Sequence, residues 1–406
     1  MDKQLVITNY KNKIISLIYE DHQLVEIKTD ENTCDVRIGD ICIGKVKNIV
    51  KNINAAFVEI QEGIVGYYSL IENKKHHFVN VKKNNKITTG DEIIVQVITD
   101  NIKTKSIALT GNLNFTGRNI VLTVNKPFIG VSAKICHADE KKRLKAILEP
   151  YMNEEYGFIV RTNAKSIEAG TLIDETKKLI HKYNHVMEQA RYAVCFTKVY
   201  IGKTSYLKAV GDLYGKNLVK IITDSPQVYS ELSRLFINQG LPSESVLEFY
   251  DDSLVSLIKL KNIETQIERT LKEQVWLKSG ASIVIQQTEA LTAIDVNTGK
   301  FAGKKNIDDT FLKINLEAAL EIGRQLRLRN LSGIILIDFI NMKKPVYQEH
   351  LLDELTKVLS KDSVKTVVLG MTKLNLVEVT RKKEQKPLHE QLGRQCPKCH
   401  GRGYLF

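Results

Sequence analysis

Residues 289–299 read Glu-Ala-Leu-Thr-Ala-Ile-Asp-Val-Asn-Thr-Gly, and residues 333–341 read Gly-Ile-Ile-Leu-Ile-Asp-Phe-Ile-Asn. Each segment is an apolar run that reaches a carboxylate, which predicts two strands with Asp295 and Asp338 at their ends. Side chains alternate along a strand, so Asn297 lies on the same face as Asp295 and can orient its carboxylate. Carboxylates at strand ends can hold Mg²⁺, which binds few protein oxygens and keeps several waters. Such an ion activates water and stabilises charge on a phosphodiester.

The simpler alternative is that each aspartate only caps its strand and begins a turn. The sequence between the two strands bears on this choice. Apolar residues from 307 to 326 recur at helical spacing, which predicts a helix that connects the strands. Two strands that end in aspartate around one helix favour the metal site over two unrelated caps.

Four segments of the chain together resemble the ribonuclease E/G family of bacterial endoribonucleases. They are residues 289–297, 315–319, 324–329 and 333–340, in the order and spacing of the family. The resemblance runs from about residue 5 to the C-terminus. It implies an endoribonuclease with Mg²⁺ at Asp295 and Asp338, with Asn297 holding Asp295 in position. It also implies products with 5′-phosphate and 3′-hydroxyl ends.

Composition is that of a globular protein with a basic balance. The chain has 406 residues, 43% hydrophobic and 26% charged, and a formal net charge of +12, so we expect two to four domains. The charge favours a polyanionic partner such as nucleic acid, although a lysine-rich proteome would give the same excess. The N-terminus lacks a basic segment followed by an apolar run, and no apolar stretch is long enough to span a bilayer. We therefore expect a cytosolic (cytoplasmic) protein.

The six cysteines are too few for a disulfide scaffold. Four are scattered in apolar contexts, and we predict them to be buried free thiols: Cys34, Cys42, Cys136 and Cys195. The other two, Cys396 and Cys399, form a Cys-x-x-Cys pair followed by His400. A structural zinc site needs four ligands, so this pair is incomplete by itself. A redox dithiol is the alternative, but no thioredoxin-like βαβ pattern surrounds the pair.

The family resemblance gives the pair a role. In the family, two cysteines from each of two subunits share one ion in a zinc-link. The resemblance therefore implies a homodimer with Zn²⁺ held by Cys396 and Cys399 of both chains.

Residues 36–115 contain short strands separated by glycine-rich turns, which predict a small antiparallel barrel of the OB-fold type. Such barrels bind single-stranded RNA by stacking bases on surface aromatics beside basic side chains. Phe57 and Tyr67 are the candidate platforms and Lys105 is a candidate phosphate contact. On residue type alone, the favoured alternative is that both rings belong to the barrel core. The resemblance favours RNA binding and implies an S1-type domain, with Tyr67 where the family usually has Phe.

Residues 116–206 combine predicted strands with two amphipathic helices, and one strand ends in Arg161 and Thr162. Arginine suits bidentate phosphate binding, and a hydroxyl can add a hydrogen bond. On residue type alone, an ordinary surface pair is the alternative. The resemblance implies a sensor for a 5′-monophosphate on RNA. By this resemblance it would be formed by Arg161 and Thr162 with Gly117, Val121 and Lys365. The family has Arg at the last position, and Lys keeps the charge but loses the planar fork.

The resemblance also implies the arrangement of the remaining chain, an α/β multidomain fold. Residues 1–35 and 207–272 would form an RNase H-like structural subdomain, into which the barrel and sensor are inserted. Residues 273–390 would form a DNase I-like catalytic subdomain, and residues 391–406 the zinc-link. At the end of the long helix, Arg324, Arg327 and Arg329 would either complement the helix dipole or contact the RNA backbone.

Together these features predict a metal-dependent endoribonuclease of messenger RNA decay and ribosomal RNA processing that favours 5′-monophosphorylated single strands. A non-catalytic RNA-binding protein with the same fold is the main alternative, and a metal phosphodiesterase acting on DNA is a second. The presence of Asp295, Asn297 and Asp338 argues against the first. The barrel and the sensor argue against the second.

Overall fold

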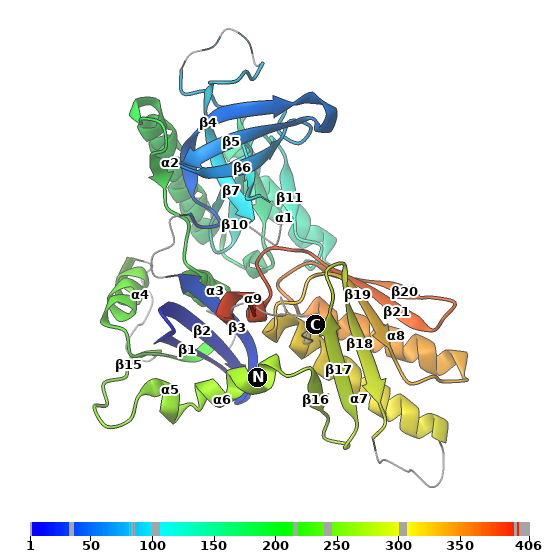
Figure 1. The fold of residues 1–406 in the computed structure, drawn as a ribbon. Helices are drawn as coiled ribbons and strands as arrows, with labels where there is room; N and C mark the ends of the chain where they lie inside the picture. The colour runs from blue at the N-terminus through cyan, green and yellow to red at the C-terminus, as the bar shows by residue number, and fades with distance from the viewer. Residues whose placement is uncertain are drawn as a thin grey trace. The chain divides into compact units, whose positions relative to one another are not determined.

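The computed structural model describes residues 2–31, 36–80, 82, 84, 86–99, 106–213, 218–238, 246–299, 307–393 and 396–397. The chain divides into two compact units. The first combines residues 1–33 with 205–406, and the second contains residues 34–204. Both mix helices with sheets, so the expected α/β class is confirmed (Figure 1). Among the described residues, no helix is both long and apolar enough to cross a membrane.

The first sheet of unit 1 has the strand order β15-β14-β1-β2-β3. Strands β1, β2 and β3 are an antiparallel meander, and β14 adds to β1 in parallel. Alternating residues of β1 enter two different hydrophobic clusters, with Leu5 and Ile7 in one and Val6 in the other, so both faces of this sheet are buried. The strands are β1 (Lys3–Tyr10), β2 (Lys13–Glu20), β3 (Gln23–Glu31), β14 (Leu218–Thr223) and β15 (Leu247–Phe249), with helices α3 (Ser205–Leu213), α4 (Pro226–Asn238), α5 (Leu257–Leu260) and α6 (Ile263–Leu271).

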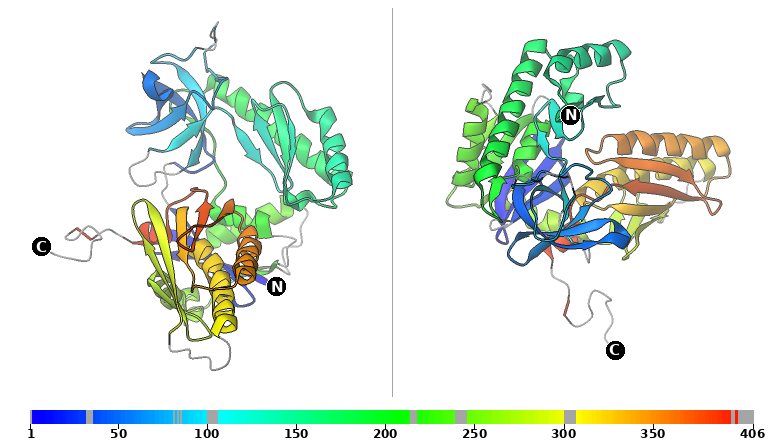
Figure 2. Two further views of the ribbon diagram at one scale, coloured as in Figure 1. Left: turned by 90° about the vertical axis from the view of Figure 1, so that its right-hand side faces the viewer. Right: turned by 90° about the horizontal axis from the view of Figure 1, so that it is seen from above.

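The second sheet of unit 1 has the order β16-β17-β18-β19-β21-β20. Helices α7 and α8 pack against one face, where Ile294, Ile335 and Val379 are buried with Ala318 and Leu355 (Figure 2). Side chains of the opposite face, which we call the open face, include exposed residues of β18 and β19. The elements are β16 (Gln274–Trp276), β17 (Ser282–Gln287), β18 (Leu291–Asn297), α7 (Ile307–Leu328), β19 (Gly333–Asp338), α8 (Pro345–Ser360), β20 (Thr366–Met371), β21 (Leu376–Arg381) and α9 (Leu388–Leu392).

Unit 2 begins with a barrel in which β4, β5, β6, β8 and β7 follow one another and β7 pairs back with β4. The expected small barrel is therefore confirmed as five closed strands compatible with an OB-fold, but it is not wholly antiparallel, because β6 and β8 pair in parallel. Glycines allow close packing inside it, since a Cβ on Gly44 would lie 2.5 Å from Val58 and one on Gly66 2.5 Å from Leu109. The elements are β4 (Ile41–Val50), η1 (Lys51–Ile53), β5 (Ala55–Gln61), β6 (Ile64–Ser69), β7 (Glu92–Thr99) and β8 (Ala108–Thr110), with β13 (Lys198–Tyr200) added to β4.

A four-stranded sheet of order β11-β12-β10-β9 completes unit 2. One hydrophobic cluster joins it to the barrel and to both helices, because Ile41 and Ile43 of β4 pack with Phe158 of β12 and Leu172 of α2. The elements are β9 (Asn114–Thr116), β10 (Ile120–Val124), β11 (Ile129–Val131), α1 (Ala138–Leu148), η2 (Glu149–Tyr151), β12 (Tyr156–Val160), η3 (Thr162–Ala164) and α2 (Ala169–Tyr192). The RNase H-like and DNase I-like assignments and the five domain boundaries stay predictions.

Candidate active site

Asp295 and Asp338 are direct partners on the neighbouring parallel strands β18 and β19. Both are exposed on the open face, where alternate residues of β18 are exposed and those between them are buried. Neighbouring strands lie about 4.8 Å apart, so the two carboxylates stand side by side. The predicted strands thus bring the two aspartates together.

Polar side chains fix the surroundings of this pair. The Asn297 amide donates to Oδ2 of Asp295 over 2.7 Å, which is the orienting contact expected from the sequence. Behind the pair, the buried side chain of Asn315 on α7 donates to the carbonyl of Ile340 over 2.8 Å and accepts from its amide over 3.1 Å. This two-way contact holds the chain just after Asp338. Sequence reasoning missed it, although Asn315 lies in one of the family-like segments.

The donor set suits a hard cation with few protein ligands. Among the described residues, no group of three or more His, Cys, Asp or Glu is arranged as a metal site. Two adjacent carboxylates nevertheless fit Mg²⁺, which uses one or two carboxylates and fills its remaining positions with water and substrate oxygens. The residues present therefore fit the expected ion.

In unit 2, Phe57 and Tyr67 are cross-strand partners on β5 and β6. Their rings meet edge to face, with centroids 6.3 Å apart. Their neighbours Ala56, Val58 and Tyr68 point into the barrel and are fully buried, whereas both rings are only half-buried. The two aromatics therefore lie on the outer face of the barrel and not in its core. Lys105 lies outside the described residues.

Arg161 follows the end of β12, and its guanidinium donates to the carbonyl oxygens of Gly117 over 3.2 Å and Arg118 over 3.4 Å. Thr162 comes next, and its Oγ1 lies 3.1 Å from the hydroxyl of Ser132. A Cβ at position 117 would fall 2.9 Å from the carbonyl oxygen of Ile120 and 2.0 Å from the Glu175 carboxylate, so the backbone of this turn leaves little room for a side chain.

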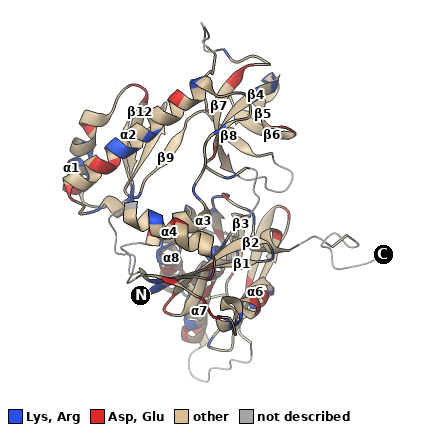
Figure 3. Ribbon diagram, turned by 90° about the vertical axis from the view of Figure 1, so that its left-hand side faces the viewer, with Lys and Arg blue, Asp and Glu red and all other residues tan. Residues whose placement is uncertain are grey.

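Val121 stands on β10 beside β12 and is half-buried. Arg161, Thr162 and Gly117 thus gather in one place, which we call the Arg161 cluster. Along α2, which packs against this sheet, acidic and basic residues are interspersed (Figure 3).

Lys365 belongs to unit 1, where it is exposed just before β20. Its carbonyl accepts from the Lys382 amide over 2.9 Å, so the backbone at this position is tied to the residue after β21. Of the predicted zinc ligands, Cys396 is exposed, and Cys399 lies outside the described residues.

The sequence profile of the "Ribonuclease E/G family" matches residues 114–384. The chain is 34% identical to ribonuclease G of Escherichia coli over 377 residues, which cover 90% of this chain and 77% of that protein. It is 32% identical to ribonuclease G of Haemophilus influenzae, covering 98% of this chain and 83% of that protein.

The chain belongs to the ribonuclease E/G family. It is also 31% identical to ribonuclease E of Synechocystis over its full length, which covers 60% of that longer protein.

The arginines of the family-like segment 324–329 are used inside unit 1. Arg324 binds Glu321 of its own helix and donates to the carbonyl of Leu24 over 2.8 Å, and Arg327 reaches Glu20 on β2 at 3.5 Å. Arg329 is 7% exposed and donates to the Lys272 carbonyl, and burial lowers its pKa to about 10. These contacts join the two sheets of unit 1 and favour neither of the two roles expected from the sequence.

One expectation about the cysteines is wrong. Cys42 is buried, but Cys136 is exposed and Cys195 is half-buried, while Cys34 lies outside the described residues. The apolar context of Cys136 misled the prediction, because Ile135 takes the buried position and the next side chain points outward.

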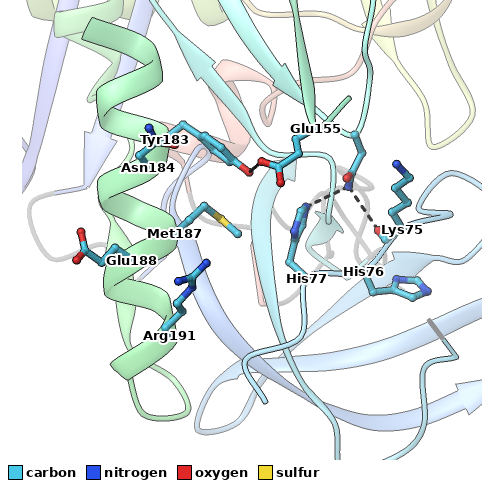
Figure 4. Close-up of a pocket in the computed structure, with 10 residues that line it drawn as sticks. Lys75, His76, His77, Glu155, Tyr183, Asn184, Met187, Glu188 and Arg191 are labelled. Carbon is cyan, nitrogen blue, oxygen red and sulfur yellow. Dashed lines mark hydrogen bonds between the residues drawn. The ribbon is translucent and has the colours of Figure 1, made fainter. Parts of the chain in front are cut away.

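Unit 2 also contains a pocket of about 730 Å³ that the sequence did not indicate (Figure 4). The Asn125 amide donates to Nε2 of His77 over 3.1 Å, and the Tyr183 hydroxyl donates to Glu155 over 3.1 Å. Burial lowers the pKa of His77, partly offset by Glu155. The pocket adjoins the beginning of β12, whereas Arg161 follows its end, so the pocket is separate from the Arg161 cluster.

Proposed function

We propose that this member of the ribonuclease E/G family is an endoribonuclease that cuts single-stranded RNA with a divalent cation, Mg²⁺, at Asp295 and Asp338. The observation that carries the proposal is the direct pairing of these two exposed carboxylates on neighbouring strands, with Asn297 bonded to one of them. The names of the relatives support the reaction class. RNA is the substrate, and messenger and ribosomal precursors are the class of molecule on which such an enzyme acts.

In the proposed reaction, water attacks phosphorus and the bond from phosphorus to the 3′ oxygen breaks. The phosphate stays on the 5′ end of one product, and the 3′ oxygen takes a proton to become a hydroxyl. When bound, the cation supplies water activation and charge stabilisation. Asp295 and Asp338 hold it, Asn297 keeps Asp295 in its orientation, and Asn315 fixes the backbone that follows Asp338.

Unit 2 would bind the substrate at two places. The exposed sides of Phe57 and Tyr67 offer stacking surfaces for bases, with Lys105 as a phosphate contact. The Arg161 cluster would hold the 5′-monophosphate, because Arg161 is oriented by two carbonyl oxygens and Thr162 supplies a hydroxyl. The family resemblance also assigns phosphate binding to Lys365 of unit 1, which would offer a single charge in place of a planar fork.

Cys396 and Cys399 would bind Zn²⁺ together with the same two residues of a second subunit, giving a homodimer. One Cys-x-x-Cys pair supplies two of the four thiolates that a structural zinc ion needs. The exposure of Cys396 is compatible with a ligand shared between chains.

The test is to incubate the purified protein with a 5′-monophosphorylated single-stranded RNA, with and without Mg²⁺, and to map both product ends. We expect Mg²⁺-dependent internal cuts that leave 5′-phosphate and 3′-hydroxyl ends. Tight RNA binding without cleavage in any divalent cation would favour the non-catalytic alternative. Equal cleavage of single-stranded DNA would favour the DNA phosphodiesterase.

A further inference from the structure

We infer that Trp276 is a base-stacking platform that positions the RNA strand beside the Asp295–Asp338 pair. This inference rests on the proposed function and adds a positioning residue to its site. The sequence contains one Trp, and its side chain is 65% exposed. Large aromatic rings that remain open to solvent near a reactive centre are a common feature of binding surfaces.

The strand register places Trp276 on the open face. Trp276 pairs with Ser282 across β16 and β17, and Ser282 pairs with Asn297 across β17 and β18. Directly paired residues point to the same face of a sheet. Trp276, Ser282 and Asn297 therefore form one row across the open face. The indole begins about 10 Å from Asn297, two strand spacings away.

The next row of paired residues on the same face, two positions back along β18, contains the reactive pair. Val284 pairs with Asp295, Asp295 with Asp338, and Asp338 with Leu376. Strand β16 runs parallel to β18, because each is antiparallel to β17. Trp276 ends β16, so it lies at the same edge of the sheet as Asn297, next to the aspartates and not at the far end of their strands.

Ser282 lies between Trp276 and Asn297 in this row. It is only 3% exposed although it lies on the open face, and its hydroxyl accepts from the Gln274 amide over 3.2 Å. This low exposure means that neighbouring groups, the Gln274 amide among them, lie over Ser282. A base on the indole, about 10 Å from Asn297, and a phosphate at the aspartates can still belong to one short stretch of RNA.

Charge explains why stacking suits this place. Glu378, which pairs with Leu336 on β19, adds a third carboxylate to the open face beside Asp295 and Asp338. Three carboxylates repel the phosphates of a polyanion. Binding energy near them comes best from uncharged contacts to the bases, and an indole provides these for any base. Lys278, exposed two residues after Trp276, offers a phosphate contact at the outer edge.

Because Trp276 is the one tryptophan of the sequence, tryptophan fluorescence reports on this site alone. The first measurement is the Trp fluorescence of the full chain during titration with a 5′-monophosphorylated single-stranded oligoribonucleotide, without divalent cation, so that binding is seen without cleavage. We expect a saturable change in emission and protection from acrylamide quenching. Unchanged emission and quenching at saturating RNA would overturn the inference.

The variants are Trp276→Ala, Trp276→Phe and, as a control, Leu254→Ala, which truncates a 91% exposed side chain elsewhere in unit 1. Loss of one stacked base predicts that Trp276→Ala weakens RNA binding by about 5-fold or more, equally at low and high salt. Trp276→Phe should retain most of the affinity. Lys278→Ala should instead reduce the salt dependence of binding.

An abasic scan separates stacking from a structural effect. An RNA that lacks one base close to the cleaved bond should bind wild type more weakly, and the same omission should cost little in Trp276→Ala. Equal losses in both proteins at every position would overturn the inference. The proposed function would still stand if wild type cleaves RNA with Mg²⁺. Conversely, a fluorescence response without any cleavage would overturn the proposed function and leave the stacking site.

Discussion

Arg381 and Asp362 form an ion pair inside unit 1, with 2.7 Å between Nε and Oδ2 and each side chain 3% exposed. A second nitrogen of Arg381 donates to Asn330 over 2.8 Å and to the Leu331 carbonyl over 3.1 Å. The guanidinium thus ties the end of β21 to the segment that leads from α7 into β19, the strand of Asp338.

We expect Arg381→Ala to destabilise unit 1 strongly, by about 3–5 kcal/mol, because it leaves the Asp362 carboxylate buried without its partner. Trp276 lies in the same sheet, so its fluorescence follows urea unfolding of this part. The control is Lys357→Ala, which removes an exposed pair with Glu354 and should cost less than about 1 kcal/mol. A midpoint for Arg381→Ala equal to that of the control would contradict the argument.

Asp295→Asn and Asp338→Asn should each abolish cleavage while RNA affinity changes only a few-fold. An amide lacks the charge that would hold the cation, whereas the proposed substrate contacts lie on other surfaces as well. Asn297→Ala should slow cleavage less, because it removes only the 2.7 Å contact that orients Asp295. Single-turnover rates over a range of Mg²⁺ concentrations measure this. Asp353→Asn, an exposed carboxylate on α8, is the matched control and should behave like wild type.

Thiol reactivity should distinguish Cys42 from Cys136. Burial, reinforced by Asp40, raises the pKa of Cys42 to about 12, so almost no thiolate is present at neutral or mildly alkaline pH. We expect Cys136→Ser to remove one rapidly labelled thiol from the native protein, and Cys42→Ser to remove none. In denaturant each variant should lose one. Rapid native labelling that disappears in Cys42→Ser would show that the thiol is accessible.

Sequence patterns predicted the site at the level of strands and not of contacts. Alternation placed Asp295 and Asn297 on one face, and the ends of two apolar runs placed Asp338 nearby. The direct pairing of the two aspartates depends on a parallel register that no local pattern encodes. The hydrogen bond from Asn315 to Ile340 joins residues 25 positions apart, and the one from Arg324 to Leu24 joins residues 300 positions apart. Neither can be predicted from a local sequence pattern. Trp276 could be assigned to the open face only once β16 was paired with β17.

The Arg161 cluster should make cleavage depend on the 5′ end. We expect 5′-monophosphorylated RNA to be cut faster than the same RNA with a 5′-hydroxyl or a 5′-triphosphate. Arg161→Ala should erase this preference without slowing cleavage of the 5′-hydroxyl RNA, because that substrate presents no phosphate to the guanidinium. Lys142→Ala, an exposed cation on α1, controls for a general loss of positive charge. Lys365→Arg should increase the preference if a planar fork improves the site. Equal rates on all three substrates in wild type would contradict the sensor.

Zinc should couple to association of two chains. If the proposed zinc site is correct, each Cys396–Cys399 pair would supply half of a tetrahedral site. A shared ion would then bind only when two subunits meet, and its binding would stabilise the dimer. We expect about one zinc ion per two chains by metal analysis and a homodimer by sedimentation velocity. Chelation, or replacement of both cysteines by Ser, should shift the protein toward monomer at a given concentration. Cys136→Ser keeps the pair intact and should leave both the zinc content and the dimer unchanged, which separates the effect from general thiol loss. About one zinc ion per chain, or a dimer that persists fully after zinc removal, would contradict a site shared between subunits.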